Sequence, residues 1–166
     1  MTDEPVGDIV RVCADCGSRN EKAQRIADLI SESTGHRWVG VYSVARGTVA
    51  LEAWSGPAPP AYPEFPEDQG LTGAAIAARD VVLSNDVTTD PRYPTNCATT
   101  GSGLIAPVLA GSQVVATIDL ESDRLGAFSE ADAGLARRLA ATAAPLWAES
   151  PPRAAAGAAR DARSDR

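Results

Sequence analysis

The sequence predicts an α+β domain in which an antiparallel sheet buries its apolar face under helices. The first observation is a predicted β-hairpin between residues 100 and 122, where two apolar runs flank the glycine-bearing turn 110–113. The second is an earlier predicted hairpin over 36–54, which turns at 45–48. The third is a helical spacing of apolar residues near both ends of the chain.

The second strand of the later hairpin has two different faces. Side chains alternate along a strand, so one face is apolar and the other ends in the carboxylates of Asp119 and Glu121. The apolar face carries Val114, Ala116, Ile118 and Leu120. A sheet of this kind covers its apolar face with helices, and its other face lines a pocket or meets water. We therefore expect function on the face of Asp119 and Glu121.

Two helices are predicted near the start of the chain. Residues 8–16 place Cys13 and Cys16 on the buried stripe of a short helix. Ser18 and Glu21 have the spacing of a capping box, which opens the next helix. The C-x-x-C spacing also fits a metal site, but a zinc ion needs four ligands and the sequence has no second such pair. We expect two core thiols and no metal.

The last helix is predicted to begin at Ser129, where Asp132 completes a second capping box. Pro145 lacks a backbone donor and clashes with the preceding turn, so we expect it to kink this helix. The alanine- and arginine-rich end of the chain has almost no large apolar side chains, which predicts disorder. The expected organisation is an N-terminal helical extension over 1–17, one domain over 18–149 and a disordered tail over 150–166.

Two connections in the middle of the chain are expected at the surface. Residues 57–68 hold five prolines, which exclude a helix or an inner strand, so this segment runs extended and could cover the mouth of a pocket. A short helix over 70–79 and a brief strand over 81–84 follow. Residues 85–101 then form a long loop, which is typical of binding segments. Cys97 lies in this loop among mainly acidic charges, which favours an unreactive thiol.

Composition excludes several classes of partner. The net charge of −7 and the pI near 4.7 describe an acidic protein that repels phosphate backbones and anionic lipids, so we expect no nucleic-acid and no membrane partner. The acidic N-terminus differs from a signal peptide, and we expect a cytoplasmic protein. Residues 101–106 match the spacing of a dinucleotide-binding motif, but a strand follows where a helix is required. We therefore expect no cofactor.

A series of short segments, in a fixed order, carries a family resemblance. They are Trp38-Val39-Gly40-Val41-Tyr42, Gly70-Leu71-Thr72-Gly73, Asp90-Pro91-Arg92-Tyr93, Thr99-Thr100-Gly101-Ser102, Ala106-Pro107-Val108, Ile118-Asp119-Leu120-Glu121-Ser122 and Phe128-Ser129-Glu130-Ala131-Asp132. With these segments the chain from about Ser18 to Trp147 resembles a GAF domain. The resemblance implies a central antiparallel sheet of about six strands, with terminal helices on one face and a small-molecule pocket on the other.

Within that family the chain is similar to the free methionine-(R)-sulfoxide reductases, in which a loop cysteine attacks the sulfoxide and pocket carboxylates hold the amino acid. Cys97 falls near the place of the reactive cysteine, and Asp119 and Glu121 fall where these enzymes have two acids before a serine. The chain departs from their pattern at Thr72, which replaces a second cysteine, and at Gly103, which replaces a pocket glutamate. A sulfenic acid on Cys97 would then need an external thiol to reduce it.

These patterns favour a noncatalytic sensory GAF module that binds an unidentified small molecule. Two alternatives stay open: a reductase that uses Cys97, and an interaction module that forms a homodimer. The large rings of Tyr42 and Trp54 suit either core packing or a ligand site. The residues predicted to bind the ligand are Tyr42, Trp54, Asp86, Tyr93, Ser102, Asp119 and Glu121.

Overall fold

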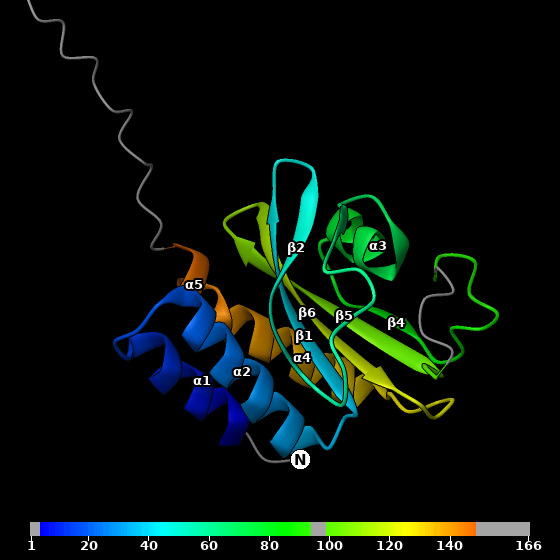
Figure 1. The fold of residues 1–166 in the computed structure, drawn as a ribbon, viewed down its shortest axis with the longest axis horizontal. Coiled ribbons are helices and arrows are strands. Elements are labelled where there is room, and N and C mark those ends of the chain that lie inside the picture. Colours follow the sequence, from blue (N-terminus) through cyan, green and yellow to red (C-terminus); the bar gives the residue numbers. More distant parts are fainter. Residues whose placement is uncertain (1–3, 94–98, 149–166) are drawn as a thin grey trace, which may run out of the picture.

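The computed structural model describes residues 4–93 and 99–148 of the 166-residue chain (Figure 1). The helices are α1 (Glu4–Ala14), α2 (Arg19–Thr34), α3 (Gly70–Ala78), α4 (Glu130–Ala143) and α5 (Pro145–Ala148). The strands are β1 (Trp38–Ala45), β2 (Thr48–Ser55), β3 (Glu64–Pro66), β4 (Val82–Ser84), β5 (Ser102–Ala110) and β6 (Gln113–Ser122). The sequence does not predict β3, which lies inside the proline-rich connection.

The strands form one antiparallel sheet in the order β3-β2-β1-β6-β5-β4. Its centre consists of the two predicted hairpins, β1 with β2 and β5 with β6, which join where β1 pairs with β6. The edge strands β3 and β4 have only three residues each, and short edges limit pairing with other chains. The predicted α+β fold, with a six-stranded antiparallel sheet, is confirmed.

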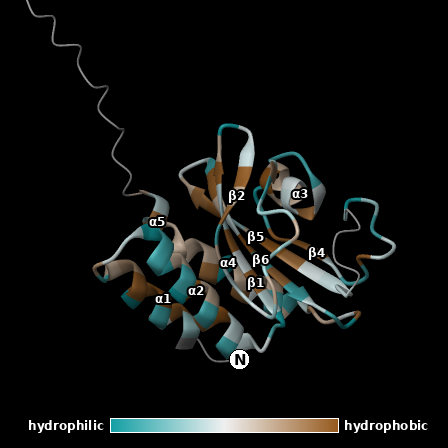
Figure 2. Cartoon of the chain, viewed as in Figure 1, coloured by the Kyte–Doolittle hydropathy of each residue, from teal (hydrophilic) through white to brown (hydrophobic). Residues whose placement is uncertain are grey.

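The helices α2 and α4 cover one face of this sheet, and α1 packs against both of them (Figure 1). Ile26 of α2 and Leu139 of α4 are buried in one core with Ile118 of β6. Figure 2 shows hydrophilic and hydrophobic residues alternating along α1 and α2, as expected of helices that bury one side only. This layer contains the main hydrophobic core, and it fixes which face of β6 points away from the helices.

The helix α3 lies on the opposite face of the sheet, where it contacts β4, β5 and β6. Two neighbouring residues of β5 show the division: Leu104 belongs to the main core, whereas Ile105 packs with Leu71 of α3 in a second, smaller core. Successive side chains of a strand point to opposite faces, so the two cores lie on the two sides of the sheet. The side with α3 is the side of Asp119 and Glu121.

Both predicted capping boxes are present. The backbone N–H of Ser18 donates to the Glu21 carboxylate at 2.8 Å, and that of Ser129 donates to the Asp132 carboxylate at 2.8 Å. Within the described part of the chain, no helix has both the length and the apolar character that crossing a membrane requires.

The first helix corrects the prediction for one cysteine. Because α1 ends at Ala14, Cys13 is half-buried, with its Sγ 3.8 Å from the carbonyl oxygen of Thr142, but Cys16 is exposed. The chain leaves the helix early because Ser18 already has the extended backbone of the next N-cap. The prediction that both thiols are buried is therefore wrong for Cys16.

The interruption predicted at Pro145 is confirmed. The helix α4 ends at Ala143, and the short helix α5 begins at Pro145. The buried ring of Trp147 then packs into the main core. The predicted boundary at 149 and the predicted tail over 150–166 lie outside the described residues.

Candidate ligand-binding site

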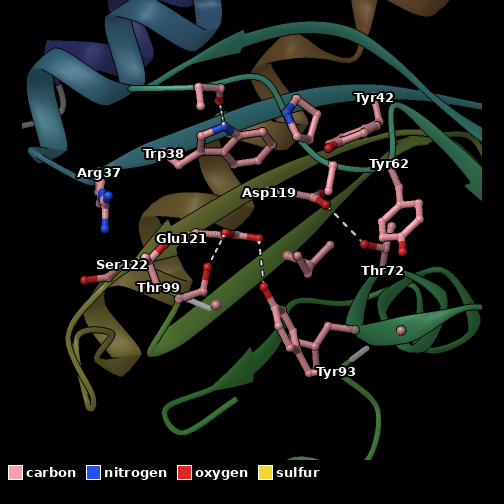
Figure 3. A pocket seen from close by; sticks show the side chains of 18 of the residues that line it. Arg37, Trp38, Tyr42, Tyr62, Thr72, Tyr93, Thr99, Asp119, Glu121 and Ser122 are labelled. Carbon is pink, nitrogen blue, oxygen red and sulfur yellow. Dashed lines mark hydrogen bonds between the residues drawn. The ribbon is translucent and has the colours of Figure 1, made fainter. Parts of the chain in front are cut away.

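A cavity of about 440 Å³ opens on the α3 face of the sheet (Figure 3). Its floor is formed by β1, β5 and β6, and one wall is the start of α3. A second wall is formed by residues 57–62, which we call the strap, and a third by Tyr93 with residues 99–100. The volume is within the range of sites for small molecules, roughly 300 to 1,000 Å³.

Asp119 lies at the centre of the floor. It stands on β6 between Gly40 of β1 and Ile105 of β5, so both edges of its strand are hydrogen-bonded. Its Oδ2 accepts a hydrogen bond from the Thr72 hydroxyl at 3.1 Å, and the residue is only 6% exposed. Its Oδ1 is buried and has no hydrogen-bond partner among the described residues. A buried carboxylate oxygen without a donor is costly, which marks this atom as a place for a ligand donor or a bound water.

Glu121 lies two residues further along the same face. Its Oε2 accepts from the Thr100 hydroxyl at 2.8 Å, and its Oε1 accepts from the Tyr93 hydroxyl over a longer distance of 3.4 Å (Figure 3). Both donors flank the segment 94–98, which lies outside the described residues. The wall of the cavity that Tyr93 and Thr100 form is thus attached to the floor through Glu121.

The two carboxyl groups have perturbed acidities. Burial is the main reason that the pKa of Asp119 rises to about 7, and the charge of Glu121 acts in the same direction. The Thr72 hydroxyl opposes this rise, as does the nearby Thr117 hydroxyl, although Thr117 forms no hydrogen bond with Asp119. Burial also raises the pKa of Glu121. A cation between the two groups would favour their ionised forms.

Aromatic rings form the wall above the floor. Trp38 and Tyr42 lie on either side of Gly40, with ring centroids 6.4 Å apart, and Phe65 meets the Tyr42 ring edge-on at 5.7 Å. A β-carbon at Gly40 would lie 2.3 Å from Trp38 Cη2 and 2.7 Å from Tyr42 Cε2. Only glycine therefore lets both rings fold over the strand.

The strap is fastened to this wall. The indole N–H of Trp38 donates to the carbonyl oxygen of Ala58 at 3.1 Å, and β3 anchors the other end of the connection to β2. The prediction that the proline-rich connection covers a pocket mouth agrees with the cavity lining, which includes the whole strap.

The structure separates the predicted ligand-binding residues into two groups. The cavity is lined by Tyr42, Tyr93, Asp119 and Glu121. Trp54, Asp86 and Ser102 do not line it.

Local structure accounts for the second group. Ser102 points to the other side of β5 and is fully buried, with its hydroxyl donating to the carbonyl oxygen of Arg124 at 2.7 Å. The carboxylate of Asp86 accepts from the backbone N–H and hydroxyl of Thr88 and so stabilises a turn. Trp54 pairs with Gly40 on β2, one strand further from Asp119 than Gly40, and it is not part of the cavity lining. Cys97 lies outside the described residues.

The cavity residues that were not predicted as ligand contacts include Arg37, Trp38, Thr72 and Thr100. Thr72 and Thr100 reach the carboxylates from 47 and 21 residues away in the sequence, so no local pattern reveals them. The described residues contain no group of three or more His, Cys, Asp or Glu side chains that could hold a metal ion.

Comparison with known protein families assigns the chain to one of them. The profile of the GAF domain family matches residues 17–147. The chain belongs to the GAF family. Protein ZMO0507 of Zymomonas mobilis is 31% identical to this GAF domain over 96 residues, which are 57% of this chain and 58% of that protein. The chain thus spans less than two thirds of the length of ZMO0507.

Named enzymes are also among the relatives of this GAF domain. The free methionine-R-sulfoxide reductase of Escherichia coli is 26% identical over 119 residues, 72% of this chain and 71% of the enzyme. The type II free methionine-R-sulfoxide reductase of Thermoplasma acidophilum superposes with a TM-score of 0.74 at 29% identity, covering 79% of this chain and 93% of that chain. The predicted distant similarity to these reductases is confirmed.

Two further structures, each below 25% identity, show the shared fold. The free methionine-R-sulfoxide reductase of Neisseria meningitidis, in complex with its substrate, has a TM-score of 0.79 at 24% identity and covers 89% of this chain and 92% of that chain. The GAF domain of an Acinetobacter phosphoenolpyruvate-protein phosphotransferase has a TM-score of 0.78 at 16% identity, with 89% and 95% covered. The same fold therefore occurs in a free methionine-R-sulfoxide reductase and in the GAF domain of a phosphotransferase.

Proposed function

We propose that the cavity binds a small molecule with an ammonium group, held by Asp119 and Glu121, and that the domain acts as a ligand sensor. The observation that carries this proposal is the bare, buried Oδ1 of Asp119 in a cavity that also contains Glu121. An ammonium group would donate to this atom and reduce the repulsion between the two carboxylates.

A free amino acid is the ligand class that the relatives favour. Several of them are named free methionine-R-sulfoxide reductases, and one of these structures contains its substrate. The cavity of this chain has the volume for such a molecule, and its aromatic and apolar lining would pack against an aliphatic side chain. Methionine-(R)-sulfoxide is therefore the first ligand to test, followed by other small amines.

Calorimetric titration of the purified protein with methionine-(R)-sulfoxide and a panel of amine metabolites tests the proposal. Asp119→Ala should weaken the binding of every ligand that the parent binds by about tenfold or more, since a hydrogen bond to a charged group contributes roughly 1.5 to 3 kcal/mol. Asp86→Asn is the matched control, because this carboxylate lies outside the cavity. Unchanged affinity in Asp119→Ala and in Glu121→Gln would contradict the proposed site.

Reduction of methionine-(R)-sulfoxide is a second candidate function. The 29% identity to the Thermoplasma reductase and the presence of Cys97 favour it. In such a cycle the cysteine thiolate takes the oxygen of the sulfoxide, which releases methionine and leaves a sulfenic acid. Two equivalents of an external thiol then restore the cysteine and yield a disulfide and water.

The two candidates differ in their dependence on Cys97. The parent protein and Cys97→Ser are incubated with methionine-(R)-sulfoxide and excess dithiol, and the release of methionine is followed. A binding module binds the sulfoxide in both proteins and releases no methionine. Turnover in the parent that disappears in Cys97→Ser would establish the reductase and exclude the sensor.

A further inference from the structure

The charged groups of the cavity change in a regular way from its floor to its mouth. Asp119, Glu121 and Asp123 follow one another at every second position of β6 and its end, and all three line the cavity. Asp119 is 6% exposed, Glu121 is partly buried, and the side chain of Asp123 is 54% exposed. Along the strand the carboxylates therefore lie progressively closer to solvent, and Asp123 lies at the mouth of the cavity.

Arg37 lies at this mouth. Among the described residues that line the cavity, it is the one with a cationic side chain. The pairing of Trp38 with Glu121 places Arg37 just beyond Glu121 at the open end of the sheet, and Figure 3 shows it on the side of Glu121 and Ser122. The cavity thus has acidic groups inside and a guanidinium at its entrance.

The guanidinium of Arg37 is held only weakly. Its Nη1 is 3.4 Å from the Asp123 carboxylate, which is long for an ion pair, and its side chain is 41% exposed. Exposed pairs of this kind contribute little to stability. A planar guanidinium with free donors is suited to a carboxylate ligand, which it binds with two parallel hydrogen bonds.

We propose that Arg37 binds the carboxylate of a zwitterionic ligand whose ammonium group lies at Glu121 and Asp119, so that the cavity selects free α-amino acids over simple amines. The inference rests on the proposed ammonium site. Two residues of a strand span roughly 6.6 to 6.8 Å. An α-amino acid has both charged groups on one carbon atom, so its ammonium group can lie at Glu121 while its carboxylate lies at Arg37, the partner of Asp123 two positions further along. The ligand carboxylate would take the place of Asp123 at the guanidinium.

The test compares methionine-(R)-sulfoxide with its methyl ester, which keeps the ammonium group and removes the negative charge. Calorimetric titration of the parent should give an affinity about five- to tenfold higher for the acid, a modest factor because the site is half exposed. Arg37→Gln should remove this preference by weakening the acid while leaving the ester unchanged. Asp123→Asn should increase the affinity for the acid about twofold, because it frees the guanidinium.

The outcomes separate this inference from the proposed function. If the parent binds the acid and the ester with equal affinity, the role of Arg37 is wrong and the ammonium site is unaffected. The same conclusion follows if Arg37→Gln weakens the binding of both ligands equally. Asp119→Ala should weaken acid and ester alike. If the parent binds neither probe, both the ammonium site and the role of Arg37 are wrong for this ligand class.

Discussion

At the scale of single residues, Asp119 combines features that a purely structural carboxylate would not need. It lies on a central strand, it is almost fully buried, and only one of its oxygens accepts a hydrogen bond within the described residues. An ionised group in this environment is destabilising, because burial removes its hydration. The ionised carboxylate of Asp119 therefore destabilises the ligand-free protein, and a bound cation would reduce this destabilisation.

The burial of the Asp119 carboxylate predicts that the stability of the fold depends on pH. The pKa of Asp119 is raised from 3.8 to about 7, so the folded state holds this proton more tightly than the unfolded state. The stability that the folded state gains from the protonated Asp119 is fully present below about pH 4. It is lost as the pH rises to about 7. Asp119→Asn removes the titration, so its melting temperature relative to the parent should increase between pH 5 and pH 8. The expected gain is about 2 kcal/mol, or roughly 5 °C.

Differential scanning calorimetry of both proteins across this pH range provides the measurement. Asp86→Asn is again the control. The pKa of Asp86 is lowered, mainly by the Thr88 hydroxyl, so the stability it contributes is lost towards acid pH instead. A constant difference between Asp119→Asn and the parent from pH 5 to pH 8 would show that Asp119 does not titrate in this window.

Gly40 predicts a second effect at this scale. A methyl group there would overlap the rings of Trp38 and Tyr42, so Gly40→Ala should destabilise the fold by about 1 to 3 kcal/mol. Gly134→Ala in α4 is a suitable control, since its new methyl group would meet only Arg138 at 3.8 Å. That change should stabilise the helix by up to about 1 kcal/mol. Chemical denaturation measures both, and similar effects of the two changes would contradict the crowding at Gly40.

At the scale of elements, the strap differs from the sheet in how it is held. Each residue of the floor belongs to a strand with partners on both sides. The strap is attached through the bond from Trp38 to Ala58, the bond from the Leu51 N–H to the Pro63 carbonyl oxygen, and the three residues of β3. Segments with few backbone hydrogen bonds open at low free energy. The strap is therefore the wall of the cavity that is easiest to displace.

Trp38→Phe should loosen the strap, because phenylalanine keeps a ring and removes the N–H donor. Hydrogen exchange measured by mass spectrometry should become several-fold faster at the hydrogen-bonded amides where the connection joins β2, those of Leu51 and β3, with little change in β6. Trp54→Phe is the matched control, since this ring does not line the cavity. Equal exchange of these amides in the parent and in Trp38→Phe would show that the bond to Ala58 does not fasten the strap.

At the scale of the whole molecule, one sheet joins the helical core to the ligand cavity, so binding and folding are coupled. A ligand at 100 times its dissociation constant stabilises the folded state by about 2.7 kcal/mol. For a chain of this size the melting temperature should rise by roughly 5 to 10 °C, in a single transition. Differential scanning calorimetry with a ligand that was identified by titration measures this increase in melting temperature. A second transition, or an increase restricted to part of the unfolding enthalpy, would show that the cavity region unfolds independently.

The sequence predicts the fold better than the site, and the reason is the range of the interactions. Capping boxes and hairpin turns are encoded by residues three or four positions apart, and they are present where predicted. The alternation of β6 also identifies both carboxylates of the floor. By contrast, Thr72 reaches Asp119 only through the folded chain. Ser102 was predicted as a ligand contact, but its place in β5 puts it on the side opposite to Ile105.

The antiparallel pairing of β6 with both β1 and β5 has a consequence for how this domain could evolve. A carboxylate on a strand that is bonded along both edges cannot be moved without breaking the sheet. The strap tolerates insertion and replacement, because little of the fold depends on it. Under the proposed ligand role, descendants of one domain would keep Asp119 and Glu121 as the ammonium site and change the residues around the ligand's side chain. They would then recognise different amino acids.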